Sequence, residues 1–433
     1  MKPIWTENVY LPRFESLAGS VKTDVLIIGG GLAGILCAYF LDKAGVDYLL
    51  VEGARICGGN TKGTTAKITS QHGLVYERLI RTVGADKAGM YLRANQEAVA
   101  EYCELCRGMD CDFERKSAFV YSFTDRRKLE KEAEALSRIG EKPLFLEQTE
   151  ELPFSTVGAV GLDGQAQFHP LKFVSALAEG LRIREQTFVK ELGKKKAITD
   201  KGEISFEKLI VATHFPMDNK HGLYFLKMYQ HRSYVMALQN APHLEGMYVD
   251  EAQGGMSFRR YKEYLLLGGG GARTGKKSGK WSELRSFAET HYPGASPEYF
   301  WAAQDTMTLD GIPYIGRYSP QMPECYVVTG FNKWGITSSM VSAMLLADLV
   351  REKKNPYEEL FHPSRSMLRP RLLVNGWEAL ANLLTFSGKR CPHMGCALKW
   401  NAAEQTYDCP CHGSRFDREG NLVDNPAAGG LKE

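Results

Sequence analysis

The most constraining feature of the sequence is a glycine-rich turn that joins a short apolar run to a helical one. Residues 24–28 are almost entirely apolar, as expected for a strand that is buried on both faces of a parallel sheet. The sequence Gly-Gly-Gly-Leu-Ala-Gly follows at 29–34, and residues 35–44 have the composition of a helix. A second apolar run, 46–51, ends at Glu52. This order predicts a strand–helix–strand unit of an α/β fold.

The glycines of this unit predict a dinucleotide site. Gly29 permits a tight turn, Gly31 lets the backbone approach a pyrophosphate, and Gly34 lets the helix pack closely on the strand. The start of the helix offers unpaired N–H groups and partial positive charge to phosphates. Glu52 follows at the distance where an acid accepts hydrogen bonds from ribose hydroxyls. A glycine turn without a nucleotide is the alternative, and the acid at this spacing favours the nucleotide.

The C-terminal region holds a second motif, a Cys-x-His segment followed by a Cys-x-x-His segment. Their residues are Cys391, His393, Cys409 and His412. Each segment carries one more cysteine, Cys396 or Cys411. Two thiolates and two imidazoles fit either a Rieske [2Fe–2S] cluster or a tetrahedral zinc ion. The additional cysteines and the sequence Cys-Pro-Cys-His-Gly-Ser favour the cluster, since a zinc site needs neither.

The composition argues against several classes of partner. A chain of 433 residues is long enough for two or three domains. The net charge is only +3, so neither nucleic acid nor a membrane is indicated as a partner. No apolar run has the length of a signal-peptide core or of a membrane span, and we expect a cytoplasmic protein. Seven of the ten cysteines fall into two clusters, three within 103–111 and four within 391–411, which is typical of metal or redox use in an intracellular chain.

Later segments complete a pattern that resembles a known family. A loop of small residues, which includes Thr65 and Ala66, follows the ribose acid, and an apolar strand is expected at 208–213. Near residue 330 a strand, a glycine turn and a long helix follow one another. With the glycine-rich unit, these segments resemble the D-amino-acid-oxidase-like FAD oxidoreductases over roughly residues 21–352. With the Cys/His segments, the whole chain resembles the bacterial FAD-dependent oxidoreductases fused to a C-terminal Rieske domain.

The resemblance implies an α/β architecture. It consists of a Rossmann-like FAD-binding domain with an inserted α+β substrate domain, followed by a small, truncated all-β Rieske lobe. The expected borders are 21–125, 165–215 and 300–352 for the FAD-binding parts, 126–164 and 216–299 for the substrate domain, 353–388 for a linker and 389–433 for the lobe. A lobe of about forty-five residues buries little apolar surface. We therefore expect it to lean on the FAD domain, on the cluster, or on both.

The resemblance also implies which residues hold noncovalent FAD and a [2Fe–2S] cluster. The expected FAD-binding residues are Gly29, Gly31, Gly34, Glu52, Thr65, Ala66, Gly330 and Thr337. The expected cluster ligands are Cys391, His393, Cys409 and His412, with a disulfide between Cys396 and Cys411. Phe416 stands where high-potential members of the Rieske family have a tyrosine. We expect the missing hydroxyl to lower the potential, because one hydrogen-bond donor to the cluster is lost.

Candidate substrate residues come mainly from the inserted domain. Arg259 or Arg273 is able to hold a carboxylate through a bidentate hydrogen bond, although a strand arginine is more often solvated. His72 either approaches the flavin or has a structural role. Residues 270–277 resemble a phosphate-binding loop but lack its Ser or Thr. The Cys-x-x-Cys at 103–106 fits buried helix positions better than a redox pair.

These expectations combine into one functional hypothesis. The resemblance implies a FAD-dependent dehydrogenase that oxidises a small organic substrate, an amine or amino acid, and passes electrons to the Rieske cluster. An external one-electron carrier would then take them from the cluster. Two alternatives remain open: a reductase with the opposite electron flow, and a non-catalytic flavin and iron–sulfur redox sensor. The sequence determines neither the substrate and the carrier nor the oligomeric state.

Overall fold

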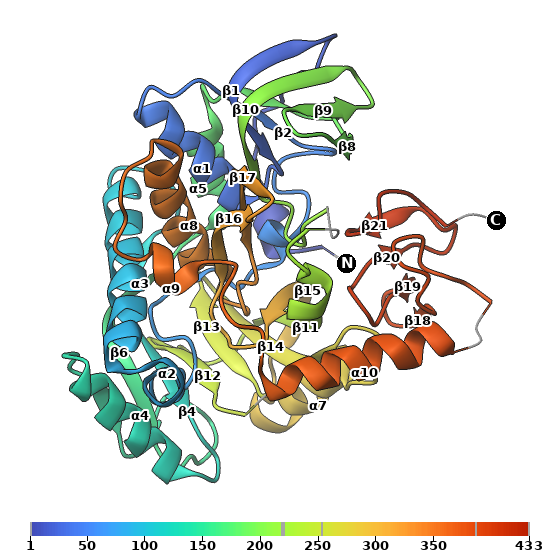
Figure 1. Cartoon of the computed structure of the whole chain (residues 1–433). Helices are drawn as coiled ribbons and strands as arrows, with labels where there is room; N and C mark the ends of the chain where they lie inside the picture. The colour runs from blue at the N-terminus through green and yellow to red at the C-terminus, as the bar shows by residue number, and fades with distance from the viewer. Residues whose placement is uncertain (1, 218–220, 253, 386–387, 432–433) are drawn as a thin grey trace.

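The computed structural model describes residues 2–217, 221–252, 254–385 and 388–431. Within these residues, two large sheets lie beside a helical layer, and a small third sheet projects at the C-terminal side (Figure 1). The mixed α/β fold class is therefore confirmed. None of the helices in these four ranges has both the length and the apolar character needed to cross a bilayer.

The first sheet carries the glycine-rich turn. Its eight strands are β1 (Val21–Ile28), β2 (Tyr48–Val51), β7 (Ile183–Arg184), β8 (Val189–Leu192), β9 (Lys196–Thr199), β10 (Glu203–Val211), β16 (Tyr314–Ser319) and β17 (Met322–Thr329). The main path runs β16-β17-β10-β1-β2-β7, and β9 pairs with both β10 and β8. β1 is parallel to both neighbours, β2 and β10. Its last four residues are buried, which explains why this strand is a continuous apolar run.

Helices cover this sheet and bury most of the core. They include α1 (Leu32–Lys43), α3 (Ala85–Leu105), α5 (Pro170–Ala178) and α8 (Gly335–Val350). α1 packs against α8 and α5, and α3 packs against α8. α1 and α8 are almost completely buried along their length, so apolar residues appear on every side of both helices. The packing of this layer places the starts of α1 and α8 at the same edge of the sheet as the glycine-rich turn.

The second sheet forms the other half of the large body. Its nine strands are β3 (Lys67–Ile68), β4 (Glu114–Tyr121), β5 (Leu144–Leu146), β6 (Ala159–Gln167), β11 (Met228–Gln239), β12 (Met247–Asp250), β13 (Ser257–Tyr261), β14 (Tyr264–Arg273) and β15 (Ser296–Thr308). The path is β15-β11-β14-β13-β12-β4-β6-β3, with β5 beside β6. The helices near it are α2 (Tyr76–Val83), α4 (Arg126–Arg138), α6 (Tyr224–Lys227) and α7 (Lys280–His291), and short 3₁₀ turns lie at η1 (Ile4–Thr6) and η2 (Asn60–Gly63).

This sheet takes strands from both parts of the expected domain division. β3, β4 and nearly all of β15 belong to it, although the sequence-based borders placed them in the FAD-binding parts. The reason is long-range pairing: β4 lies between β6 and β12, and β15 pairs along its length with β11. Apolar strand composition is equally compatible with either sheet, so local pattern does not decide the assignment.

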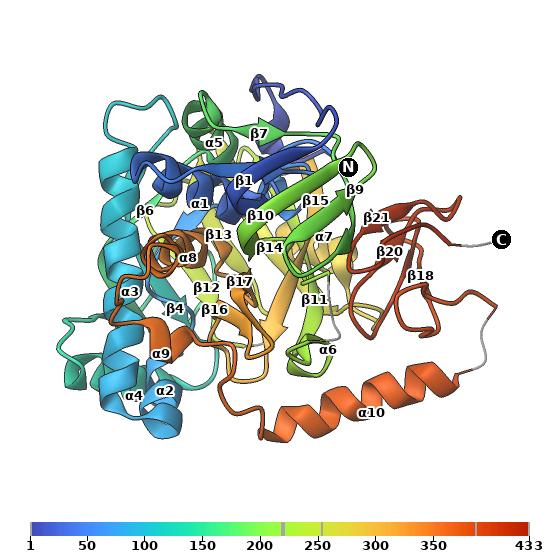
Figure 2. The ribbon, with the colours of Figure 1, turned by 45° about the horizontal axis from the view of Figure 1, so that its top comes forward.

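The C-terminal lobe is a four-stranded antiparallel sheet. Its strands, in order, are β18 (Lys399–Asn401), β19 (Thr406–Asp408), β20 (Arg415–Phe416) and β21 (Leu422–Asp424). The segment expected as a linker contains two helices, α9 (Glu358–Phe361) and α10 (Pro370–Leu384). α10 runs along the edge of the molecule towards the lobe (Figure 2).

Candidate active site and metal centre

The glycine-rich turn has the geometry that a dinucleotide needs. Gly29 has φ +112°, and a Cβ there would lie 2.5 Å from the Ala212 carbonyl oxygen. A Cβ on Gly34 would overlap the carbonyl oxygen of Gly29, so only glycine allows α1 to sit this close to β1. Gly31 is the N-cap of α1. The Leu32 N–H donates to Oγ1 of Thr61 (3.0 Å), and the amides that follow it in the first turn of the helix can bind an anion.

The turn opens into a large cavity. It has a volume of about 1200 Å³, and Gly29, Gly31, Glu52, Thr65 and Gly330 line it. The Glu52 carboxylate accepts hydrogen bonds from the backbone N–H groups of Gly30 (2.7 Å) and Ala54 (2.9 Å), which fix it at the end of β2. The volume, the glycine cradle and the oriented acid all fit an FAD molecule.

Three of the expected FAD residues do not line the cavity: Gly34, which packs α1 against the turn, and Ala66 and Thr337, which lie behind the wall. Ala66 is fully buried and Thr337 is 1% exposed, and neither belongs to the lining residues. The Thr337 hydroxyl bonds with Nε2 of His72 (2.9 Å) and donates to the Thr69 carbonyl (3.1 Å). Thr337 therefore supports the start of α8 from inside the core.

His72 also lies behind the wall. Its Nδ1 bonds with the Tyr91 hydroxyl (2.7 Å), and its ring stacks on Trp334, which lines the cavity. Burial lowers the pKa of His72 to about 3, so the ring is neutral. The structure places this candidate in a supporting position under Trp334.

Neither candidate arginine lines the cavity. Arg259 is completely buried; it donates to the Ala66 carbonyl (2.6 Å), and its guanidinium lies 5.2 Å from the Trp5 ring centroid. Arg273 donates to Oδ1 of Asn375 in α10 (2.8 Å). The structure thus places both arginines between elements of the fold, where Nη1 of each donates a hydrogen bond and each guanidinium lies over an aromatic ring. Nε and Nη2 of Arg259 and Nε of Arg273 are buried without a hydrogen-bond partner among the described residues.

The cavity contains ionisable side chains that sequence reasoning missed. They are Lys67, His214, Asp250, Asp305 and Lys333. Burial lowers the pKa of Lys67 to about 7, with a further contribution from the positive charge of Arg259. Burial also raises the pKa of Asp250 and of Asp305 and lowers that of Lys333. Only Lys333 had a sequence signal, since it lies in the glycine turn after residue 330.

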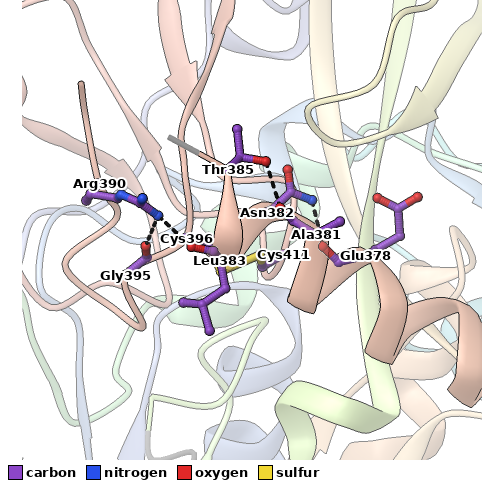
Figure 3. The surroundings of a disulfide bond; sticks show 9 residues. All are labelled: Glu378, Ala381, Asn382, Leu383, Thr385, Arg390, Gly395, Cys396 and Cys411. Atoms are coloured by element: carbon purple, nitrogen blue, oxygen red, sulfur yellow. Dashed lines mark hydrogen bonds between the residues drawn. A yellow bond between two sulfur atoms is a disulfide. The ribbon is translucent and has the colours of Figure 1, made fainter. Parts of the chain in front are cut away.

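The lobe gathers the expected cluster ligands at one end of its sheet. The thiols of Cys391 and Cys409 are in hydrogen-bond contact, which lowers the pKa of Cys391 to about 7. The imidazole rings of His393 and His412 are 5.1 Å apart. Cys396 and Cys411 form a disulfide beside them (Figure 3). Thiols adjacent to thiols and imidazoles adjacent to imidazoles match a cluster in which one iron takes two cysteines and the other two histidines.

The same geometry does not match a single zinc ion. Among the described residues, one group brings three or more candidate ligand atoms within 4.8 Å of one another, and it consists of Cys396, Cys409 and Cys411. Two of these three cysteines are in the disulfide. By contrast, Nδ1 of His412 is buried without a hydrogen-bond partner in the described structure. An unpaired buried imidazole nitrogen is costly unless a metal uses it, so this atom fits the role of an iron ligand.

Buried ion pairs join the lobe to the large body. Glu404, before β19, accepts from Nε of Arg232 in β11 (2.9 Å) and from Arg415 in β20 (2.7 Å). Arg415 also donates to Asp408 and Asp424, at 3.0 Å each. Glu404, Arg232 and Arg415 are all less than 9% exposed. These contacts tie the lobe to β11 of the second sheet, which the sequence-based borders assign to the substrate domain.

Three further contacts hold the cluster loops against the cavity. Nδ2 of Asn425 donates to the carbonyls of Thr213 (2.6 Å) and Phe215 (3.0 Å). Nε2 of Gln304, a cavity residue, donates to the Gly413 carbonyl (2.8 Å). The His412 ring lies 5.9 Å from the Phe215 ring. As a result, residues 422–428 of the lobe line the same cavity as the glycine-rich turn.

A dinucleotide cavity bordered by a two-cysteine, two-histidine lobe defines a flavin-dependent oxidoreductase with an iron–sulfur centre. Residues 24–349 match the family model for FAD dependent oxidoreductases, and residues 377–433 match that for the Rieske [2Fe-2S] domain. The protein therefore belongs to the FAD dependent oxidoreductase family and carries a C-terminal Rieske domain. It is an oxidoreductase, and the expected cofactors, FAD and a [2Fe–2S] cluster, are confirmed.

Relatives and solved structures agree with this assignment. YhfW of Bacillus subtilis (strain 168), whose name describes a Rieske 2Fe-2S iron-sulfur protein, is 34% identical over 99% of this chain and 96% of its own length. Gamma-glutamylputrescine oxidoreductase of Escherichia coli (strain K12) is 23% identical over 79% of this chain and 87% of its own length. Glycine oxidase from Geobacillus kaustophilus superposes with a TM-score of 0.68 at 21% identity, covering 80% of this chain and 99% of that one. L-proline dehydrogenase from P. horikoshii gives 0.67 at 18% identity, covering 81% and 98%. The two structures show the shared fold.

Proposed function

We propose that this enzyme is a dehydrogenase which oxidises a small amine or amino acid and passes the electrons from FAD to its own Rieske cluster. The observation that carries the proposal is the shared cavity wall: residues 422–428 of the Rieske lobe line the cavity together with Gly29, Glu52 and Gly330. Bound FAD accepts two electrons from an organic substrate and releases them singly, which suits a one-electron acceptor next to it.

The chain offers a short connection between the two cofactor sites. Gln304 lines the cavity and donates to the Gly413 carbonyl, next to His412. From another loop of the lobe, Asn425 donates hydrogen bonds to two backbone carbonyls in the segment that follows β10. These contacts hold the cluster loops in one position against the flavin cavity. An acceptor fixed in this way needs no domain movement to receive electrons.

The charges in the cavity support an amine or amino acid as substrate. Lys67 is 8% exposed, and its Nζ has only a 3.4 Å contact with Oγ1 of Thr65 among the hydrogen bonds and salt bridges of the described residues. A buried ammonium in a cavity is stabilised by an anionic substrate group. Asp250, on β12, borders the same cavity and offers an acceptor to a substrate amine. Lys67 and Asp250 replace Arg259 and Arg273 as our candidates for substrate contact.

Anaerobic stopped-flow mixing with a panel of amino acids and their decarboxylated amines tests the proposal. We expect the flavin absorbance to bleach first and the cluster to be reduced afterwards, with carboxylated substrates preferred. In air, the Cys409→Ser variant should accumulate reduced flavin because its acceptor is lost. Cys103→Ser, which removes a half-exposed thiol elsewhere, is the control and should behave like the wild type.

Two outcomes contradict the proposal. If reduced flavin reoxidises in air equally fast in the wild type and in Cys409→Ser, the cluster is not the acceptor. If an external one-electron donor reduces the cluster before the flavin while no member of the panel reduces either, the enzyme is a reductase with the opposite flow. In the direction we propose, a cytoplasmic one-electron carrier takes the electrons from the cluster.

A further inference from the structure

Helix α10 turns its apolar face away from the protein. The outward residues are Leu373 (78% exposed), Val374 (56%), Trp377 (70%), Leu380 (48%) and Leu384 (67%). Leu373, Trp377, Leu380 and Leu384 follow one another at spacings of three and four, so they form one stripe along the helix. Figures 1 and 2 show α10 running along the edge of the molecule. A continuous exposed stripe of this kind marks an interaction surface.

The opposite face of α10 is polar and holds the helix in this orientation. Asn375 and Asn382 are the buried residues of the helix. Asn375 accepts from Arg273, and Glu378 pairs with Lys276 (2.7 Å). A polar inward face with an apolar outward face is the reverse of the usual surface helix. The orientation is therefore set by specific contacts, which do not cover the apolar stripe.

Positive charge borders both ends of the stripe. Residues 366–400 contain five Lys or Arg residues and one acid. The cations are Arg369, Arg371, Lys389, Arg390 and Lys399. All except the half-buried Arg369 are exposed. The one acid is Glu378, whose carboxylate forms an ion pair with Lys276. The surface that α10 presents is thus apolar in the middle and cationic at its ends.

This charge distribution decides between two occupants. A second copy packed on the stripe would bring the cationic ends of two helices together, and residues 366–400 contain no exposed acid to balance them, which is unfavourable. An anionic lipid surface complements both the cations and the apolar stripe. We propose that α10 lies in the plane of an anionic membrane surface, with Trp377 and its apolar neighbours inserted at the headgroup level. Whole-chain net charge gave no sign of this, because it averages a local cluster over 433 residues.

The attachment would also fix the orientation of the cluster. The Ala397 N–H donates to the Asn382 carbonyl (3.0 Å). Arg390 donates to the carbonyls of Leu383 (2.9 Å) and Gly395 (3.0 Å), so the end of α10 is tied directly to the first cluster loop (Figure 3). Any surface that holds α10 consequently holds the loop that contains Cys391 and His393.

Vesicle co-sedimentation of the holoenzyme tests the proposal. Wild-type protein should sediment with phosphatidylglycerol vesicles, bind phosphatidylcholine vesicles far less, and show a blue-shifted tryptophan emission on binding. The double variant Leu373→Ser, Trp377→Ser should lose affinity by roughly tenfold or more. Arg371→Glu should weaken binding to phosphatidylglycerol only. Tyr10→Ser, which removes another highly exposed aromatic residue, is the matched control and should bind like the wild type.

The absorbance spectra of flavin and cluster show that each variant is folded, and all tested residues are exposed, so unfolding is not expected to intervene. Equal vesicle binding by the double variant and the wild type overturns the proposal, as does absence of binding to phosphatidylglycerol. Sedimentation equilibrium without lipid tests whether a second copy of the chain occupies the stripe instead. A dimer that the double variant abolishes would assign the stripe to a second copy and also overturn the proposal.

Discussion

The two cofactor sites are built by opposite means. The FAD turn is made by contiguous backbone, because the close approach of Gly29 and Gly34 lies within six residues of chain. The Rieske lobe takes its ligands from two short segments but its support from far away: Arg232 reaches Glu404 across 172 positions. The comparison teaches that a local motif can specify a complete nucleotide cradle, whereas a cluster motif specifies ligands and leaves stability to the rest of the protein.

The lobe's own core explains the difference. Its buried apolar cluster consists of only a few side chains, and four of them are cysteines. A core of this size contributes little to folding by itself. The buried ion pairs and the loop contacts with Thr213, Phe215 and Gln304 therefore do for the lobe what a hydrophobic core does for the FAD domain.

The strongest test of the local half of this comparison is Gly34→Ala. The added Cβ overlaps the Gly29 carbonyl, so α1 has to move away from β1. We expect a loss of about 3 kcal/mol or more, seen as a lower melting temperature and as flavin-free protein after purification. Gly376→Ala, at a helix position with nothing within 4 Å of the new Cβ, should instead stabilise by up to ~1 kcal/mol. Full flavin retention by Gly34→Ala would show that the turn is not as rigid as described.

Glu404→Gln tests the long-range half. It removes the nearer carboxylate of buried Arg232, whose Nη1 otherwise lies 4.0 Å from Oδ2 of Asp424, and one of the three carboxylates around Arg415. Removing one partner of a buried pair costs about 3–5 kcal/mol, and here the cost should fall on the lobe. We expect loss of the cluster's EPR signal while the flavin spectrum persists. Glu419→Gln, at an exposed position of the same lobe, should leave both signals intact; simultaneous loss of flavin and cluster would contradict separate support.

Lowering the pH should weaken the same ion pairs of Glu404 and destabilise the lobe less than the substitution does. Burial alone would raise the pKa of Glu404, but the hydrogen bonds and charges of Arg232 and Arg415 hold it at about 2. In the unfolded chain the carboxyl has a pKa of about 4.3. The stability that the ionised Glu404 carboxylate contributes is therefore complete above about pH 4.3 and is lost as the pH falls towards 2. Protease sensitivity of the lobe should increase over this window in the wild type and change less in Glu404→Gln.

Phe416→Tyr is the mildest change. Phe416 is fully buried within the cysteine cluster of the lobe. A hydroxyl that donates to the cluster would stabilise its reduced form by about one hydrogen bond, ~1 kcal/mol, or roughly 40 mV for a one-electron couple. A redox titration followed by EPR should show the midpoint rising. An unchanged or lower midpoint would place the hydroxyl away from the cluster.

Contiguous motifs account for what could be predicted from sequence. Glycine spacing predicted the cradle of Gly29, Gly31 and Gly34, and Cys/His spacing predicted the family match of the lobe, since both depend on neighbours in the chain. Sheet membership could not be predicted in this way. β3 is only two residues long, and β4 and β15 mix polar and apolar residues, so only their long-range pairing assigns them to the second sheet.

Site residues that belong to no sequence motif could not be predicted either. Lys67 and Asp250 carry no motif, and their interest comes from burial beside a cavity that the folded chain creates. α10 lies in the segment expected as a linker, and which of its faces points outward depends on the contacts of the Asn375 side chain with Arg273 and of the Asn382 backbone carbonyl with Ala397. Amphipathic pattern gives the two faces of a helix, and tertiary contacts decide which one the solvent meets.

The cavity wall formed by residues 422–428 has a consequence for biosynthesis. The nucleotide motif begins at residue 29, yet the pocket that surrounds the flavin is closed by residues made almost four hundred positions later. A ribosome-bound chain would display an open flavin site until its last segment emerged and docked. We therefore expect a chain whose lobe has not docked to leave this wall of the flavin cavity open to solvent.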